Sequence, residues 1–312
     1  MFMRLRFFLL TVWLALFGAG SLQAADALVV IVSSERSAAY VEAAEALTAT
    51  LESGGLARRD VLHLTAAELA AAGVLTPRLF VALGTEAAGL LARSGTRAPV
   101  LCTLLPRVSF ERIMQDSGRR VSTQFSALYL NQPFGRQLDL IGLALPQARR
   151  VGVLWGPESQ LQAGNLQLAA HARGVQLVSA RVGPGEPIFP GLKNVLDEAD
   201  VLLAVADPQL YNASSLQNIL LASFRARVPM VAFSPAYVRA GALLALHTTP
   251  AQMGRQAAGM ARQVLAGKAL PASPQYPQDF SISVNEHVAR SLGLVLEPDS
   301  LGERLRELER GK

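Results

Sequence analysis

Residues 201–220, VLLAVADPQLYNASSLQNIL, begin with six apolar residues and then place Asp207 directly before Pro208. An apolar run of this length, bounded by turn residues, is typical of a buried strand. The residues that follow, near 213–226, have the pattern of an amphipathic helix. A strand that leads through a polar turn into a helix is the repeating unit of a parallel α/β sheet. The stretch therefore predicts an α/β fold.

The same unit recurs along the chain. Apolar strands are predicted at ALVVIV (27–32), RLFVALGT (78–85), APVLCTLLP (98–106), RVGVLWGPES (150–159), VQLVSARV (175–182) and VPMVAFSP (228–235). The pattern restarts after Arg150, and a proline opens a corresponding strand in each half, Pro99 and Pro229, as is tolerated at the first position of a strand. We interpret this as two similar lobes, each a parallel sheet flanked by helices. The alternative is that such similarities between two halves occur in any α/β chain.

Composition excludes several classes of protein. The 312 residues are 51% hydrophobic and 17% charged, with a mean hydropathy of +0.29, which is enough apolar material for a large core. The formal net charge is only +5 and no run of like charges occurs, so no nucleic-acid partner is expected. Cys102 is the single cysteine and is expected in the core. The four histidines are scattered without ligand spacing, so neither a metal nor a cofactor is predicted.

The N-terminus has the pattern of a cleaved secretory signal peptide over residues 1–24. Arg4 and Arg6 precede an apolar run of about a dozen residues, and small residues follow it. The run is short for a membrane span, and no cysteine near the cleavage site would allow lipid attachment. We therefore expect a mature chain that begins at Ala25 and is periplasmic and monomeric. The alternative is an uncleaved N-terminal anchor.

Candidate ligand-binding residues lie where the predicted strands end. Parallel α/β sheets bind ligands outside the carboxyl ends of their strands, next to the free N–H groups of helix N-termini. These ends carry small, hydroxylated or acidic residues and one large aromatic, a set suited to a small polar molecule held between two lobes. They are Ser33, Ser34, Gly84, Thr85 and Thr103 in the first half, and Trp155, Glu158, Ser159, Asp207 and Ser234 in the second.

Each of these assignments has a structural alternative. Asp207 could bind the ammonium group of an amino-acid-like ligand, or it could cap the following helix or turn. Trp155 could stack on a ligand ring or cover the core. Thr85, after Gly84, could bind a carboxylate or act as a plain cap. Glu158 and Asp207 could also form an acid/base pair across a cleft, which is the only enzymatic arrangement that the sequence offers.

The ordered set of segments resembles a known family. LDLIGLALPQARRVGVLWGPES (138–159), the stretch from ADVLLAVADPQLYN to MARQVLAGK (199–268), and FSISVNEHVARSLGLVL (280–296) are similar to the substrate-binding proteins of ABC transporters, in particular the group with tryptophan- and tyrosine-binding members. The resemblance implies a type I periplasmic-binding-protein fold with a three-segment hinge. It places lobe 1 at 25–125 and 248–279, lobe 2 at 126–247 and 280–296, and a C-terminal tail at 297–312.

The function implied by the resemblance is capture of a small ligand, with an amino-acid-like molecule favoured, for delivery to an ABC permease. A periplasmic sensor that docks on a membrane receptor is the main alternative, and an extracytoplasmic enzyme is a further one. No catalytic residue is predicted. The chain departs from the family pattern at CTLLPRVSF (102–110) and at Asp207-Pro208, where many members have Asp-Asn. Ligand identity therefore does not follow from the resemblance.

Overall fold

The computed structural model describes residues 27–311, so the predicted signal peptide lies outside the described residues. The chain forms two compact units. Unit 1 contains the described residues up to Thr103 together with Ile113–Ala127 and Gly254–Ser273. Unit 2 contains Leu104–Arg112, Leu128–Met253 and the described residues from Pro274 on. Within residues 27–311, no helix combines the length and the apolarity that a membrane span needs.

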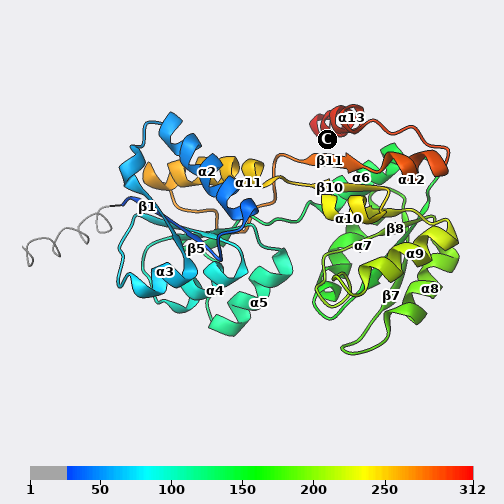
Figure 1. The fold of residues 1–312 in the computed structure, drawn as a ribbon, viewed down its shortest axis with the longest axis horizontal. Helices are drawn as coiled ribbons and strands as arrows, with labels where there is room; N and C mark the ends of the chain where they lie inside the picture. The colour runs from blue at the N-terminus through cyan, green and yellow to red at the C-terminus, as the bar shows by residue number, and fades with distance from the viewer. Residues whose placement is uncertain (1–26, 312) are drawn as a thin grey trace, which may run out of the picture. The chain divides into compact units, whose positions relative to one another are not determined.

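Unit 1 is built on a parallel five-stranded sheet of order β2-β1-β3-β4-β5. Its strands are β1 (Val29–Ser33), β2 (Val61–Thr65), β3 (Leu79–Leu83), β4 (Val100–Thr103) and β5 (Phe125–Ala127). The helices are α2 (Ala38–Ser53), α3 (Ala66–Ala71), α4 (Thr85–Arg93), α5 (Arg107–Ser117), which begins in unit 2, and α11 (Pro250–Leu265), which also begins there. Figure 1 shows α2 beside α11 on one face of the sheet, and α3 and α4 on the other.

Unit 2 is built on a six-stranded sheet of order β11-β10-β9-β8-β6-β7. Its strands are β6 (Arg150–Trp155), β7 (Gln176–Arg181), β8 (Val201–Leu203), β9 (Met230–Ala232), β10 (Leu244–His247) and β11 (Ser281–Val284). The helices are α6 (Phe134–Ala144), α7 (Ala163–His171), α8 (Ile188–Glu198), α9 (Leu216–Ala226), α10 (Pro235–Ala240), α12 (Glu286–Ser291) and α13 (Pro298–Arg310), labelled in Figure 1.

The two faces of the unit 2 sheet carry separate apolar cores. On one face, side chains of α6, α7 and α13 pack on β6, β8 and β10, with Leu140, Leu166 and Leu305 fully buried. On the other face, helices α8, α9 and α10 pack around residues such as Leu202 and Met230. Strands buried on both sides read as continuous apolar runs, as β8 does. The predicted class, two α/β lobes with parallel sheets and flanking helices, is confirmed.

Two elements differ from the sequence-based expectation. Strand β2, VLHLT, was not predicted, because it lies at the sheet edge and is only partly buried, and so lacks the continuous apolar run of its neighbours. Strand β11 was expected only as part of a crossing segment. It adds to the sheet antiparallel to β10, so the otherwise parallel sheet of unit 2 has one antiparallel edge, which is common in large α/β sheets.

Candidate functional site

Most of the predicted site residues of unit 1 have a role in the local backbone structure. The Ser34 hydroxyl accepts hydrogen bonds from the N–H groups of Glu86 and Ala87, at 3.1 Å each, and so caps the start of α4. Gly84 precedes α4 with a φ of 93°, in the left-handed region that favours glycine, and a Cβ there would lie 2.6 Å from the Ser34 Oγ. Thr85 is exposed at the first position of the helix.

The other two predicted residues of unit 1 are fully buried. The Ser33 hydroxyl lies 3.1 Å from Nε2 of His63 on the neighbouring strand. Burial is the largest cause that lowers the pKa of His63. The Thr103 hydroxyl, at the end of β4, has no hydrogen-bond partner within the described part of the chain. None of these five residues lines the unit 1 pocket that Leu69, Phe80 and Leu90 border.

Asp207 sits in a fully formed cage of backbone donors. Its side chain is 1% exposed, and Oδ2 accepts from the N–H groups of Glu158 at 3.1 Å and Ser159 at 2.8 Å. Oδ1 accepts from the N–H of Gln209 at 3.0 Å. Such donors satisfy a buried carboxylate without any cation. Asp207 therefore joins the loop after β8 to the loop after β6, which is a structural role.

The remaining predicted residues of unit 2 surround this junction. The Glu158 carboxylate forms a 2.7 Å ion pair with Arg112, and the Ser159 hydroxyl accepts from the N–H of Gly156 at 2.9 Å. Trp155 is 4% exposed and belongs to the apolar core. Ser234 caps α10 by accepting from the N–H of Ala236. The structure thus brings Glu158, Ser159 and Asp207 together.

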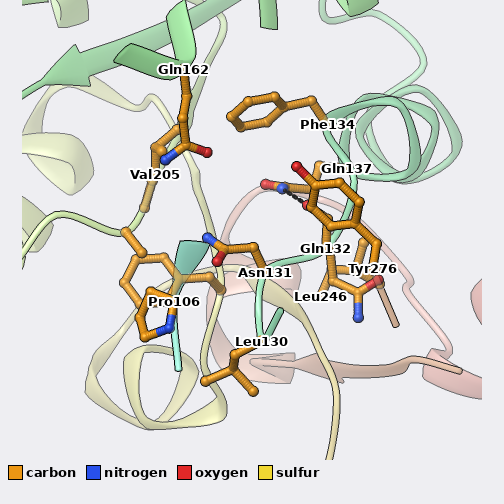
Figure 2. A pocket seen from close by; sticks show the side chains of 13 residues that line it. Pro106, Leu130, Asn131, Gln132, Phe134, Gln137, Gln162, Val205, Leu246 and Tyr276 are labelled. Atoms are coloured by element: carbon orange, nitrogen blue, oxygen red, sulfur yellow. Dashed lines mark hydrogen bonds between the residues drawn. The ribbon is translucent and has the colours of Figure 1, made fainter. Parts of the chain in front are cut away.

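A pocket lies directly beside this junction, and all of its lining residues belong to unit 2. Its cavity volume is about 80 Å³, smaller than most small-molecule sites, so it accommodates one part of a ligand rather than a whole one. Figure 2 shows side chains from several elements facing this space. The lining residues are Pro106, Leu130, Asn131, Gln132, Phe134, Gln137, Gln162, Ala204, Val205, Ala206, Phe233, Leu246 and Tyr276.

The polar lining consists of neutral groups, and most of them are held in place. The Asn131 Oδ1 accepts from the N–H of Arg107 at 2.7 Å. Both ends of the Gln132 amide are bonded, since Nε2 donates to Thr248 and Oε1 accepts from Arg136. Gln137 Nε2 donates to the Gln132 carbonyl at 2.8 Å. The acceptors and donors of this wall are therefore fixed before any ligand arrives.

Gln162 is the exception. It ends the short 3₁₀ helix Ser159–Gln162, its side chain is 2% exposed, and its Nε2 has no hydrogen-bond partner within the described residues. Figure 2 shows its amide at the pocket, on the side opposite Phe134. A buried donor without a partner costs roughly 1–3 kcal/mol. An acceptor on a bound molecule would remove that cost.

Aromatic rings complete the wall. Phe134, Phe233 and Tyr276 line the pocket. The Tyr276 hydroxyl accepts from the Arg107 guanidinium at 3.1 Å, and its ring packs edge-on against Tyr129 at 5.4 Å. Such rings present flat apolar faces to a ligand.

None of the predicted site residues lines this pocket, although two of them are adjacent in sequence to residues that do. Ala206 lies next to Asp207, and Phe233 lies next to Ser234. At each of these two points the predicted residue is small or charged, whereas the pocket is lined by its apolar neighbour and by amide side chains of adjoining segments. The only signal for the amides was a cluster of neutral polar residues at 131–137, NQPFGRQ, directly after a predicted boundary.

The fold and the pocket together define a class: a two-unit α/β protein with a pocket near the carboxyl ends of parallel strands. The family described as ABC transporter substrate binding protein matches residues 62–304, and the chain belongs to this family. Its members are substrate-binding proteins rather than enzymes, and its solved relatives have type I periplasmic-binding-protein folds.

Individual relatives are distant. A tyrosine-binding protein of Clostridioides difficile (strain R20291) is 22% identical over 163 residues, which is 51% of this chain and 47% of that protein. The matched region thus spans about half the length of this curated relative. The ligand-free, open structure of a substrate-binding protein with adhesive properties from Clostridium difficile has a TM-score of 0.67 at 19% identity, covering 86% of this chain and 95% of that chain.

A further solved structure, an ABC domain in complex with L-Trp from Streptococcus pneumoniae, has a TM-score of 0.61 at 17% identity, covering 89% of this chain and 98% of that chain. At this level of identity, the solved structures show that the fold is shared and carry no information on which ligand this chain binds.

Proposed function

We propose that this protein is an extracytoplasmic solute-binding protein that captures an amino-acid-like ligand in the unit 2 pocket and delivers it to an ABC permease. The observation that carries the proposal is the buried, unpartnered amide of Gln162 in a pocket of aromatic and neutral polar side chains. Family membership and the tyrosine-binding relative support the class of ligand.

The lining chemistry narrows the part of the ligand that enters this pocket. No lining residue is charged, and the nearby Asp207 is occupied by backbone donors. Burying a charge in such a pocket without a counter-charge is costly. We therefore infer that the buried part of the ligand is a neutral, flat apolar group with a hydrogen-bond acceptor at its edge, as in a phenolic or other polar aromatic side chain.

The first experiment is calorimetric titration of the purified protein with the amino acids and close analogues. We expect one or more aromatic amino acids to bind and to raise the unfolding temperature, with about 2.7 kcal/mol of stabilisation at a hundredfold excess over Kd. Absence of binding for every amino acid tested, on folded protein, would refute the proposed ligand class.

The second experiment addresses Gln162. Gln162→Leu removes the amide at similar volume, so we expect ligand affinity to fall about tenfold. The stability of the ligand-free protein should stay the same or increase, because the substitution also removes an unpaired buried donor. Gln160→Leu, at an exposed position of the same 3₁₀ helix, is the matched control and should leave affinity unchanged. Equal affinity of the wild type and Gln162→Leu would remove Gln162 from the site.

Delivery and location are tested separately. Cell fractionation and N-terminal sequencing of the exported chain should find a protein that begins at Ala25. Deletion of the gene should abolish high-affinity uptake of the ligand found by calorimetry, and a plasmid copy should restore it. Unchanged uptake in the deletion strain, with binding intact, would instead favour a sensor that docks on a membrane receptor.

A further inference from the structure

A buried polar network lies behind the pocket wall, and its centre is Arg136. This residue is on α6, is 9% exposed, and its Nη1 donates to Oε1 of Gln132 at 2.7 Å and to the Pro277 carbonyl at 2.9 Å. Its Nε donates to Oε1 of Glu309 on α13 at 2.6 Å. The guanidinium carbon also lies 4.9 Å from the ring centroid of Phe280, a cation–π contact.

The network joins chain segments that are far apart in sequence. Gln132 Nε2 donates to the Thr248 hydroxyl at 2.5 Å, and that hydroxyl donates to the Asp279 carbonyl at 3.3 Å. The three segments, 128–132, 248–253 and 274–280, are the parts of unit 2 next to the points where the chain passes to or from unit 1. Arg136 and Gln132 therefore fasten these segments to one another inside unit 2.

The same network holds the amides of the pocket. Gln132 lines the pocket, and its carbonyl accepts from Gln137, which also lines it. Because Arg136 occupies Oε1 of Gln132, it decides which way that amide points, and so it decides that Nε2 faces Thr248. Arg136 itself does not line the pocket, so its effect on a ligand passes through Gln132.

The carboxylate that pairs with Arg136 is that of Glu309, in the last turn of α13. Glu309 is partly exposed, but Arg136 is nearly enclosed. Removal of one partner of such a pair leaves an uncompensated buried charge, which must find water or other acceptors. The acceptors within reach are those that now fix Gln132 and Pro277.

We propose that Arg136 is the positioning residue of the pocket, and that Glu309 of α13 holds it, so that the C-terminal helix controls ligand affinity through Arg136 and Gln132. The inference rests on the proposed function, because affinity is its readout. It assigns the last turn of α13 a role beyond packing on α6.

The test compares ligand affinity in three variants, using as probe the amino acid that binds the wild-type protein most tightly in calorimetry. Glu309→Gln keeps the size of the side chain and removes its charge, and Arg136→Lys keeps a charge but lacks the planar guanidinium whose Nε and Nη1 reach different acceptors. Both should raise Kd roughly tenfold, the effect of losing one charge-assisted hydrogen bond. The double variant should be no weaker than the worse single variant, since both act on one contact.

Two controls separate positioning from stability. Glu307→Gln removes an exposed carboxylate from the same helix and should leave Kd within twofold. Leu301→Ala removes a buried side chain of α13, far from Glu309, and should lower the unfolding temperature without changing Kd. Each Kd is measured well below the unfolding temperature of its own variant, so that loss of folded protein does not enter it.

The outcomes are distinct. Tenfold weaker binding in Glu309→Gln and Arg136→Lys, with Kd unchanged in both controls, supports the proposal. A lower unfolding temperature with unchanged Kd in Glu309→Gln overturns it, and the contact is then only structural. If the wild-type protein binds no amino acid, the proposed function fails and this inference fails with it. If the wild type binds and the Glu309 variant binds equally well, only this inference fails.

Discussion

The contacts of Asp207 point to a structural role. A carboxylate at the end of a buried strand in a binding-protein fold invites assignment to a ligand. Its oxygens instead accept from three backbone N–H groups, those of Glu158, Ser159 and Gln209. The backbone of Gly156 lies so close that a Cβ there would be 2.4 Å from Oδ2. Asp207 thus joins two loops next to the pocket, and backbone donors engage both of its carboxylate oxygens.

Substitution of Asp207 tests this assignment. Asp207→Asn keeps one oxygen and replaces the other with a donor that faces backbone N–H groups, so we expect about 1–3 kcal/mol of lost stability. Ligand affinity, measured on the folded variant, should change less than threefold. Denaturant unfolding followed by calorimetric titration checks both quantities. A large loss of affinity with full stability would return Asp207 to the binding site.

Asp200 carries the clearest pH dependence in unit 2. Hydrogen bonds from the Arg150 guanidinium, aided by the N–H groups of Arg149 and Arg150, lower the pKa of its carboxyl to about 2. A lowered folded-state pKa stabilises the protein at pH values above the unfolded-state pKa, and that contribution is lost as the pH falls through about 2.

We therefore expect Asp200→Asn to be less stable than the wild type at pH 6, and the gap to close as the pH falls from 4 toward 2. Chemical denaturation at a series of pH values measures the gap directly. A difference that stays constant over this range would show that the charge of Asp200 does not contribute.

Among the elements, the crossing of α2 and α11 in unit 1 depends on one glycine. A Cβ at Gly254 would lie 2.3 Å from the Ala43 carbonyl oxygen, and a backbone atom of a packed helix cannot yield cheaply. We expect Gly254→Ala to cost about 1–3 kcal/mol.

Gly259 offers a matched control on the same helix, because a Cβ there meets nothing within 4 Å. Gly259→Ala should stabilise the protein by up to about 1 kcal/mol, the intrinsic preference of a helix for alanine. Thermal unfolding of both variants measures the contrast. Similar effects of the two substitutions would mean that the close approach of α2 and α11 is not maintained in solution.

Elements with a strong apolar pattern could be predicted from the sequence. Strands β1, β3 and β8 are buried on both faces, and their unbroken apolar runs are unlike any loop. Helix α8 spans Ile188–Glu198, where Pro187 and Ala199 flank a clear amphipathic pattern. The edge strand β2, with the exposed His63 at its centre, has no such pattern.

The site was less predictable, for a physical reason. The sequence predicts Asp207 and Ser234 at strand ends, but it does not say which backbone donors meet a carboxylate. Two of the three donors to Asp207 come from residues 48 and 49 positions earlier. Gln162 matches no motif, because its uncharged amide is distinguished only by its burial and by the lack of a hydrogen-bond partner among the described residues. Both properties arise from tertiary structure alone.

At the scale of the whole molecule, each unit has its own sheet and its own core. Trp155 is the only tryptophan within the described residues, and it is buried in unit 2. Its fluorescence therefore reports the unfolding of unit 2, whereas far-UV circular dichroism reports both units. Such a protein need not unfold in a single transition.

We expect the two signals to give different midpoints in guanidinium chloride. Asp207→Asn should shift the unfolding midpoint that fluorescence reports. Gly254→Ala, in unit 1, should shift the dichroism transition and leave the fluorescence midpoint unchanged. Coincident curves for the wild type and for both variants would show instead that the two units unfold as one cooperative body.

The order of segments has a consequence for synthesis. Unit 1 needs Gly254–Ser273 before its α2 face is covered, and unit 2 needs β11 and α13, which close the chain. Neither core can therefore be completed while the ribosome is still making the middle of the protein, although domains usually fold as they emerge. We expect nascent chains of this protein to stay incompletely folded until translation is nearly finished, which is compatible with the export that the proposed function requires.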